Sequence, residues 1–189
     1  MICSSSQVAL VELLQSGCTT TADHHYIFSN QLENAIDIQV EAAKAIGCRV
    51  VLARGSMSLG QKDGGLPPSQ TVQSEKTIME DSERVIKEFH NRGAGAFVQI
   101  ALAPCSPFSV SEDLMRSAAG LAKELDVRLH THLAETEDEE TFCLQRFGFR
   151  PVEYLEQVGW LDSGTWIAHG IHFNPVSYTH LRAHETRRY

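Results

Sequence analysis

Two stretches of this sequence place histidines where they could do chemistry. The first reads Leu129-His130-Thr131-His132-Leu133-Ala134-Glu135. Residues two apart in a strand lie on the same face, so His130 and His132 would point to one side, and Glu135 could turn back over them. Neutral imidazole is a good zinc ligand, and a nearby carboxylate can move protons to and from a water that zinc activates. The alternative is a pair of core histidines followed by a glutamate that caps a helix.

The second stretch, Trp166-Ile167-Ala168-His169-Gly170, is another apolar segment that ends in a histidine. Gly170 would allow a close approach of the backbone. In neighbouring strands of a parallel sheet, the two imidazoles would lie about 5 Å apart. Two such strand ends at one edge favour a functional site over two separate structural histidines.

Two further segments close predicted strands with reactive side chains. Cys105 lies in Ala103-Pro104-Cys105-Ser106-Pro107. Because a nucleophilic cysteine needs a neighbouring base, a thiol that lines a pocket is the favoured interpretation. In Asp23-His24-His25, adjacent residues point to opposite faces, so at most one histidine faces a site.

Two glycine-containing segments do not fit the phosphate-binding motifs that they partly match. A P-loop has lysine directly after its second glycine, whereas Gln61 intervenes here and Asp63 would put a carboxylate beside the phosphate. Gly93-Ala94-Gly95 precedes a predicted strand instead of following one, so the dinucleotide-binding fingerprint is absent.

The elements that must position these residues alternate between helix and strand. Apolar periodicity predicts strands at 18–23, 48–53, 96–103, 126–132 and 165–168, and helices at 7–16, 32–46, 74–90, 111–125, 136–147 and 151–157, with a long loop at 55–69. Such alternation predicts right-handed crossovers and a parallel sheet. An open sheet and a closed barrel both fit, but a complete (β/α)8 barrel needs about 250 residues, so 189 residues could hold only part of one.

Composition excludes several classes of protein. The chain is 42% hydrophobic and 21% charged, which is ordinary for a globular domain and unlike collagen or a disordered chain. Its net charge of −8 argues against nucleic acid or an anionic membrane as partner. No apolar run is long enough for a membrane span, and the start lacks the features of a signal peptide. Five cysteines without a CxxC pair favour a reducing cytoplasm.

Four stretches, in order along the chain, resemble the amidohydrolase superfamily, at residues 53–59, 63–68, 101–108 and 130–135. The resemblance covers about residues 6–175. Members of this superfamily are metal-dependent hydrolases with a (β/α)8 barrel, and they include guanine and cytosine deaminases. The resemblance therefore implies an incomplete TIM barrel domain at 1–175 with about strands 2 to 6. It also implies a hydrolytic deaminase that acts on a purine-like ring such as 8-oxoguanine, giving urate and ammonia.

The resemblance also implies roles for particular residues. His132 matches the metal ligand at the end of the fifth barrel strand, and Glu135 matches the glutamate that protonates a ring nitrogen. His169, at the end of the sixth strand, matches the histidine that contacts the substrate and the attacking water. Arg54 and Cys105 are implied as substrate-pocket residues, and the metal is zinc. His130 matches no ligand.

Part of the metal site of the family has no match in this sequence. The His-x-His of the first barrel strand and the aspartate of the eighth would lie before Met1 and after the last residue. Because a zinc site needs about three protein ligands, we expect this chain alone to bind zinc weakly and to lack deaminase activity. The full-length protein would take a small heterocyclic substrate and could form a homo-oligomer. Two alternatives stay open: a triazine aminohydrolase or chlorohydrolase with the same metal site, and a non-catalytic α/β binding module.

The segment 176–189 breaks the pattern of the rest of the chain. It carries three arginines in its last eight residues and no apolar periodicity, and it resembles a sequencing-adapter read-through. We therefore expect it to be foreign to the natural protein, and the fold prediction leaves it out.

Overall fold

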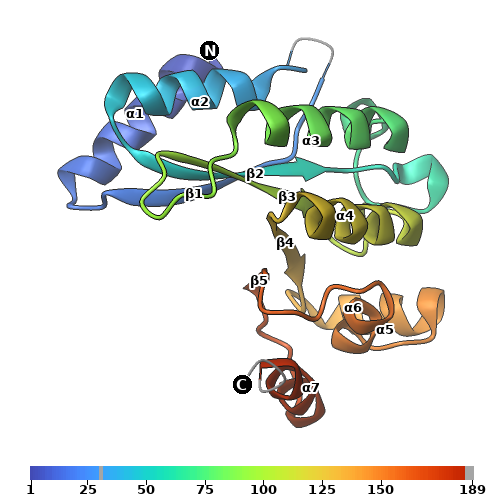
Figure 1. Ribbon diagram of the computed structural model, residues 1–189. Coiled ribbons are helices and arrows are strands. Elements are labelled where there is room, and N and C mark those ends of the chain that lie inside the picture. Colours follow the sequence, from blue (N-terminus) through green and yellow to red (C-terminus); the bar gives the residue numbers. More distant parts are fainter. Residues whose placement is uncertain (30–31, 186–189) are drawn as a thin grey trace.

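The computed structural model describes residues 1–29 and 32–185 and contains one parallel sheet with the strand order β1-β2-β3-β4-β5. The strands are β1 (Thr20–His25), β2 (Arg49–Ser56), β3 (Val98–Pro104), β4 (Arg128–Leu133) and β5 (Thr165–His169). A doubly wound sheet reverses its strand order at a switch point, whereas this order follows the sequence throughout. The sheet is therefore of the barrel type, and it forms an open half-barrel in the described residues (Figure 1).

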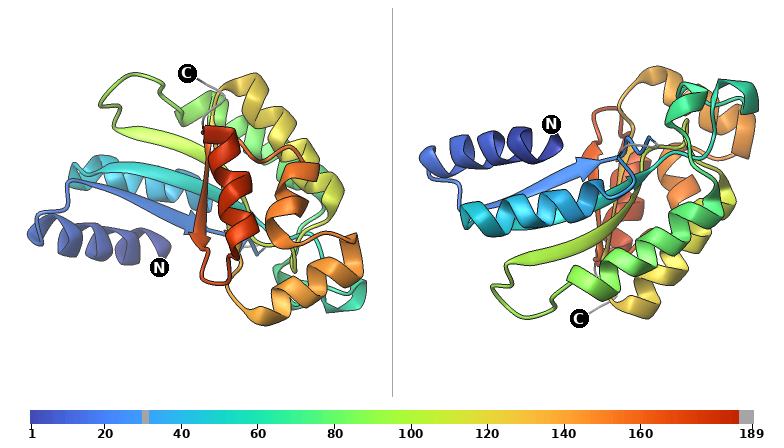
Figure 2. Two further views of the ribbon diagram at one scale, coloured as in Figure 1. Left: turned by 90° about the horizontal axis from the view of Figure 1, so that it is seen from below. Right: turned by 90° about the horizontal axis from the view of Figure 1, so that it is seen from above.

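Helices follow the strands and cover one face of the sheet. They are α1 (Ile2–Gln15), α2 (Ala35–Ile46), α3 (Glu75–Phe89), α4 (Glu112–Leu125), α5 (Glu137–Phe147), α6 (Pro151–Gln157) and α7 (Pro175–Glu185). Seen from below, β1 and β2 lie in front of α2, and seen from above α2 lies in front of them (Figure 2). One face of the sheet is thus helix-covered, and the opposite face is the inner face of the half-barrel.

Helix caps follow the sequence signals. The hydroxyl oxygen of Ser111 accepts a hydrogen bond from the Leu114 N–H at 3.0 Å, and that of Ser74 accepts one from the Thr77 N–H at 3.1 Å. At the other end, α2 ends at Gly47, whose φ of +82° is open to glycine without strain.

The second strand is longer than its apolar run predicts. β2 continues to Ser56, three residues beyond the predicted end at Ala53, because its last residues pair with β3 from Arg54↔Leu102 to Ser56↔Pro104. The first strand is likewise displaced, to 20–25 from the predicted 18–23. Arg54 is therefore a strand residue and not part of the loop that follows.

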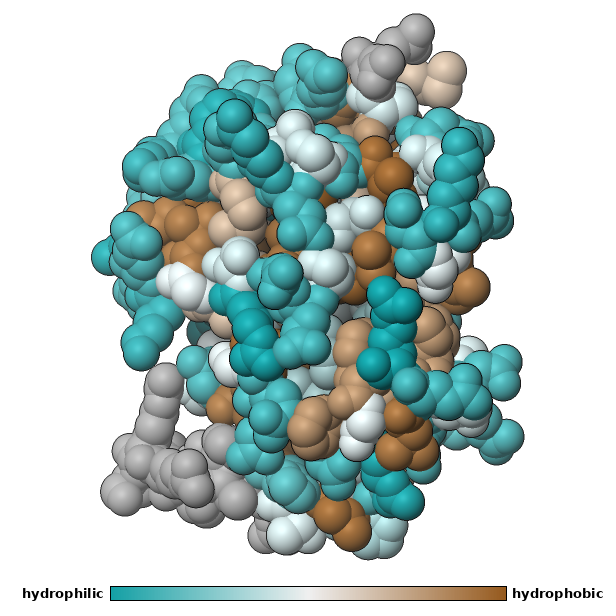
Figure 3. Space-filling model, turned by 90° about the vertical axis from the view of Figure 1, so that its right-hand side faces the viewer, coloured by the Kyte–Doolittle hydropathy of each residue, from teal (hydrophilic) through white to brown (hydrophobic). Residues whose placement is uncertain are grey.

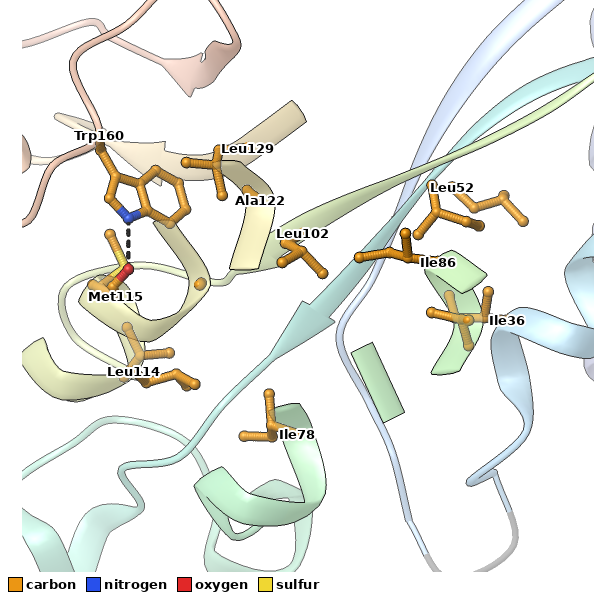
Figure 4. Packing of buried hydrophobic residues seen from close by; sticks show 14 of the residues in the cluster. Ile36, Leu52, Ile78, Ile86, Leu102, Leu114, Met115, Ala122, Leu129 and Trp160 are labelled. Atoms are coloured by element: carbon orange, nitrogen blue, oxygen red, sulfur yellow. Dashed lines mark hydrogen bonds between the residues drawn. The ribbon is translucent and has the colours of Figure 1, made fainter. Parts of the chain in front are cut away.

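The hydrophobic core lies between the sheet and its helices. Leu52 of β2 and Leu102 of β3 point toward it, together with Ile36 of α2 (Figure 4). Trp160 is fully buried there, and its Nε1–H donates to the Met115 carbonyl oxygen at 2.9 Å. On the inner face, small side chains form a separate cluster, namely Ala53, Ala101 and Ala103 with Val51 and Trp166 packed against them.

The final segment, which the sequence analysis left out of its fold prediction, forms a helix where the structure describes it. α7 extends to Glu185, Ser177 is buried, and Leu181 packs against the core. His180 Nδ1 lies 3.3 Å from Glu156 Oε2 of α6. Residues 186–189 lie outside the described part, and the foreign origin of the segment stays a prediction.

Hydrophilic side chains cover most of the side of the molecule toward which β2 runs, with smaller hydrophobic patches between them (Figure 3). Over the described ranges, the helices are too short or too polar to cross a bilayer.

Candidate active site

Three histidines share the inner face of the half-barrel because of strand alternation. His130 and His132 of β4 are two residues apart, and His132 pairs in register with Ala168 of β5. His24 of β1 is in register with Ala53, which belongs to the inner-face cluster. The predicted common face of His130 and His132 is thus present in the structure.

A fourth imidazole joins them at the carboxyl ends of the strands. The ring of His132 stacks on that of His24 with centroids 4.8 Å apart and on that of His169 with centroids 5.2 Å apart. The ring of His130 lies 4.8 Å from that of His24. We call His24, His130, His132 and His169 the histidine cluster.

The hydrogen bonds of His132 determine which ring nitrogen is available to a ligand. Its Nδ1 lies 2.9 Å from the carbonyl oxygen of Cys105. Because a carbonyl oxygen only accepts, Nδ1 carries the hydrogen, and in the neutral ring Nε2 then holds the lone pair. Metal-binding histidines are oriented in this way, by a backbone carbonyl at the nitrogen that faces away from the metal.

His130 has the surroundings of a structural residue. It is buried, its Nδ1–H donates to the Trp166 carbonyl oxygen at 3.0 Å, and its ring stacks on the Trp166 indole at 4.6 Å. Burial lowers its pKa and so favours the neutral form. These contacts are those of a residue that packs within the sheet.

His24 faces the cluster, whereas His25 lies on the helix-covered side. The Nε2–H of His24 donates to the Ala103 carbonyl oxygen at 3.0 Å, and its buried Nδ1 has no partner among the described residues. Burial lowers the pKa of His24 to about 4, so its ring is neutral near pH 7. The sequence predicted that at most one of this pair faces a site, and the structure shows that it is His24.

Glu135 lies beside His169 at the outer edge of the cluster. Its Oε1 is 3.6 Å from His169 Nε2, and the two side chains are 52% and 33% exposed. The carboxylate and the imidazole therefore meet where a small molecule could reach both. Sequence spacing predicted this meeting of His132, Glu135 and His169.

The backbone at both strand ends has the left-handed conformation, which residues other than glycine rarely adopt. Ala134, after β4, has a φ of +52°, and His169, the last residue of β5, has a φ of +74°. Gly170 N–H donates to the Leu133 oxygen at 2.9 Å and His172 N–H to the Ala134 oxygen at 3.0 Å, so the two turns are tied together. Backbone strain of this kind is concentrated at functional sites.

Cys105 contacts the cluster but is a poor nucleophile. Its Sγ lies 3.8 Å from His132 Nδ1. Burial raises its pKa to about 11, so the thiol is protonated near neutral pH. This geometry favours a residue that lines the site, as the sequence predicted, over one that attacks a substrate.

Arg54 does not lie in this site. Strand alternation places it on the helix-covered side, where its Nε donates to Asp81 Oδ2 and its Nη2 to Gln73 Oε1, both at 3.0 Å. Its guanidinium also stacks over the Phe28 ring at 4.0 Å, and its side chain is fully buried. The pocket role implied for Arg54 is therefore at odds with its position, and its structural role follows from the extension of β2.

The donor set for a metal is incomplete in the described part of the chain. Within residues 1–29 and 32–185, no three His, Cys, Asp or Glu side chains are arranged to hold a metal ion. His132 fits as one ligand through its Nε2. A complete site needs further ligands from outside these residues.

Two cavities of the half-barrel lie away from the histidine cluster. One of about 380 Å³ lies between α1 and the helix-facing side of β1 and includes His25 and Gln39. Another of about 490 Å³ includes Arg92 and Arg128 near the amino ends of β3 and β4. Neither is lined by a member of the cluster.

Glu139 of α5 was missed by the sequence analysis. It is 1% exposed, although it lies among four consecutive acidic residues in the first turn of the helix. Its carboxylate accepts hydrogen bonds from the backbone N–H groups of Ala134 and Glu135. The only signal in the sequence is the spacing of four residues between Glu135 and Glu139, which does not show which acid of the run is buried.

Comparison with known proteins places these residues in a family. Residues 4–187 match the model of the Amidohydrolase family. The 8-oxoguanine deaminase of Pseudomonas aeruginosa is 65% identical over 170 residues, which are 90% of this chain and 38% of that protein. The hydroxydechloroatrazine ethylaminohydrolase of Pseudomonas sp. (strain ADP) is 33% identical over 180 residues, 95% of this chain and 37% of that protein.

A solved structure agrees with the architecture. A mutant of the atrazine chlorohydrolase TrzN from Arthrobacter aurescens TC1, complexed with zinc and atraton, superposes with a TM-score of 0.92 at 29% identity, covering 97% of this chain and 40% of that one. The predicted partial (β/α)8 barrel is confirmed. The chain spans about two fifths of the length of these relatives.

Proposed function

This chain belongs to the amidohydrolase family, and from that premise we propose that its full-length protein is a metal-dependent deaminase that hydrolyses a purine-like ring such as 8-oxoguanine. Water would replace the amino group of the ring, giving urate and ammonia. The observation that carries the proposal is the meeting of His132, His169 and Glu135 at the carboxyl ends of β4 and β5. The 65% identity to an 8-oxoguanine deaminase supports this choice of substrate.

His132 would hold the metal through Nε2. Its Nδ1–H bond to the Cys105 carbonyl oxygen fixes the ring plane and keeps the coordinating nitrogen unprotonated. A bound divalent metal, by this proposal zinc, supplies Lewis-acid activation of water near neutral pH. The remaining ligands would come from parts of the protein outside this chain.

Glu135 would move the protons of the reaction. Its carboxylate takes a proton from the attacking water and delivers it to the ring nitrogen next to the amino-bearing carbon. The proton of the new hydroxyl group would then pass through the same carboxylate to the amino group, so that the carbon–nitrogen bond breaks, a carbonyl forms and ammonia leaves. The 52% exposure of Glu135 keeps its oxygens within reach of a substrate above the cluster.

His169 would orient the oxygen that attacks or the carbonyl of the ring. Its Nε2 lies 3.6 Å from Glu135 Oε1, so one water or ring atom could contact both groups. The left-handed backbone at His169 aims the side chain back toward His132, on whose ring it stacks.

The test is Glu135→Gln in the full-length protein. We expect turnover of 8-oxoguanine to fall by at least about 10³-fold, because the proton-transfer group is lost, while the metal content stays unchanged. Urate formation and metal analysis measure the two effects. Unchanged turnover would refute the role of Glu135, and loss of the metal would show that the carboxylate is a ligand instead.

A triazine hydrolase is the second candidate. It is favoured by the 33% identity to hydroxydechloroatrazine ethylaminohydrolase and by the superposition on TrzN. The same site would then release an alkylamine or chloride in place of ammonia. Measuring the released group from purine and triazine rings separates the two candidates, and a full-length protein without bound metal would favour a binding module.

We further propose that the 189-residue chain by itself binds zinc weakly and has no deaminase activity, because its described residues assemble no ligand set. Turnover by the purified chain with added zinc would overturn this. A cytoplasmic location is proposed from its five cysteines, all of them free.

A further inference from the structure

One buried acid contacts the segment that carries Glu135. Helix α5 begins with Glu137, Asp138, Glu139 and Glu140, and in this run only Glu139 is buried. An isolated buried carboxylate is costly unless hydrogen bonds compensate for the lost water. Its partners therefore show why it is there.

Both oxygens of Glu139 are used by consecutive backbone amides. Oε1 accepts from the Ala134 N–H at 2.9 Å, and Oε2 accepts from the Glu135 N–H at 3.1 Å. One carboxylate thus accepts hydrogen bonds from two consecutive backbone N–H groups, and the second of these is that of Glu135.

This contact differs from an ordinary helix cap. Thr136 is the N-cap of α5, and a glutamate three residues later would accept from the N–H of the cap residue itself in a capping box. Glu139 instead reaches one and two residues further back, to Glu135 and Ala134. The bonds therefore hold the turn before the helix.

The segment that follows β5 also holds this turn. The Ala134 carbonyl oxygen accepts from the His172 N–H at 3.0 Å, and Ala134 itself is in the left-handed conformation with a φ of +52°. An alanine in this conformation costs about 1 kcal/mol, so other contacts must maintain it. The hydrogen bonds that the turn makes with the Glu139 carboxylate and with the His172 N–H supply those contacts.

We propose that Glu139 is a positioning residue that holds the Ala134–Glu135 turn so that the Glu135 carboxylate stays beside His169. The effect on catalysis rests on the proposed function. The two hydrogen bonds of Glu139 do not depend on it. A carboxylate is required because it offers two acceptor oxygens, whereas glutamine offers one acceptor and an NH₂ group that would face an amide donor. Aspartate keeps both acceptors on a shorter side chain.

The first experiment uses the 189-residue chain and tests, without an activity assay, whether Glu139 protects the two backbone amides from exchange. Hydrogen exchange of the Ala134 and Glu135 amides is compared in the wild type, Glu139→Gln and the matched control Asp138→Asn. Asp138 is exposed in the same helical turn, so the control removes the same charge without touching the turn. We expect exchange at one or both amides to rise at least about tenfold in Glu139→Gln and to stay unchanged in the control. Unchanged exchange in Glu139→Gln would overturn the proposal.

The second experiment measures the consequence in the full-length protein. We expect Glu139→Gln to lower kcat about 10- to 100-fold with KM changed less than about threefold, since a small misplacement of a catalytic group is enough. Glu139→Asp should recover part of kcat, and Asp138→Asn should match the wild type. Faster amide exchange with an unchanged kcat would overturn the positioning role. A wild type that deaminates no ring would instead refute the proposed function. The exchange result would still show whether Glu139 holds the Ala134–Glu135 turn.

Discussion

The two faces of the sheet differ in the hydrogen-bond partners of the polar side chains at the carboxyl ends of the strands. On the helix-covered face, the buried Arg54 guanidinium has Asp81, Gln73 and the Gly55 carbonyl as partners. On the inner face, His24 Nδ1 is buried without a partner among the described residues, and His132 keeps the lone pair of Nε2. All three guanidinium nitrogens of Arg54 are thus paired, although Gln39 Oε1, Ser56 Oγ and Tyr154 Oη on the same side have no partner among the described residues. The unpaired atoms of the inner face are imidazole nitrogens, which are good ligands for a metal.

This difference has a physical origin. Burying a polar group without a hydrogen bond costs free energy, so only a few buried polar groups of a folded protein are unpaired. The unpaired imidazole nitrogens of His24 and His132 lie at the carboxyl ends of β1 and β4, where the proposed metal and substrate would bind. The strained backbone of Ala134 and His169 lies at the same edge.

The largest effect that tests this comparison is expected for Arg54→Met in the full-length protein. We expect the free energy of unfolding to fall by about 3 kcal/mol, because the substitution breaks a buried ion pair. Asp81 keeps a second partner in Arg84 at 2.8 Å, which limits the loss. Urea denaturation measures the change.

Arg84→Met is the matched control for Arg54→Met. Arg84 pairs with the same Asp81 but is 41% exposed, so its loss should cost about 1 kcal/mol or less. KM for the ring substrate should be unchanged in both variants. A raised KM with unaltered stability in Arg54→Met would instead place Arg54 in the substrate pocket.

A smaller effect is expected for the adjacent pair His24 and His25. Their side chains differ in face and not in type, so each is a control for the other. His24→Asn should lower kcat/KM at least about tenfold because His24 stacks on the His132 ring, whereas His25→Asn should leave it within about twofold. Steady-state kinetics of the full-length protein measures both, and equal effects would remove the distinction between the faces.

The smallest effect is expected at a buried hydroxyl of the helix-covered core that has no hydrogen-bond partner among the described residues. Tyr154 is 1% exposed, and its Oη has no partner among the described residues. Tyr154→Phe should therefore raise the free energy of unfolding by about 1 kcal/mol. Thr131→Val should lower it by about 1 kcal/mol, because the Thr131 hydroxyl donates to the Pro104 oxygen at 2.8 Å. The same sign for both substitutions would contradict this reasoning.

Local patterns in the sequence were sufficient for most of the elements and for the common face of His130 and His132. The alternation of apolar runs and helical periodicity predicted five parallel strands, and the two-residue spacing of His130 and His132 predicted their common face. Strand ends were less accurate. β2 runs on to Ser56 because pairing with β3 extends it, and this pairing depends on a strand more than forty residues away.

The amino-acid pattern was enough to identify which residues can reach the edge of the sheet, because the alternation of side chains along a strand is local and regular. The other features depend on three-dimensional packing. It placed Arg54 among the helices, brought His24 onto His132, and buried Glu139 out of a run of four similar acids. These outcomes depend on contacts between segments distant in sequence, and equivalent side chains in one run become different only when packing removes water from one of them.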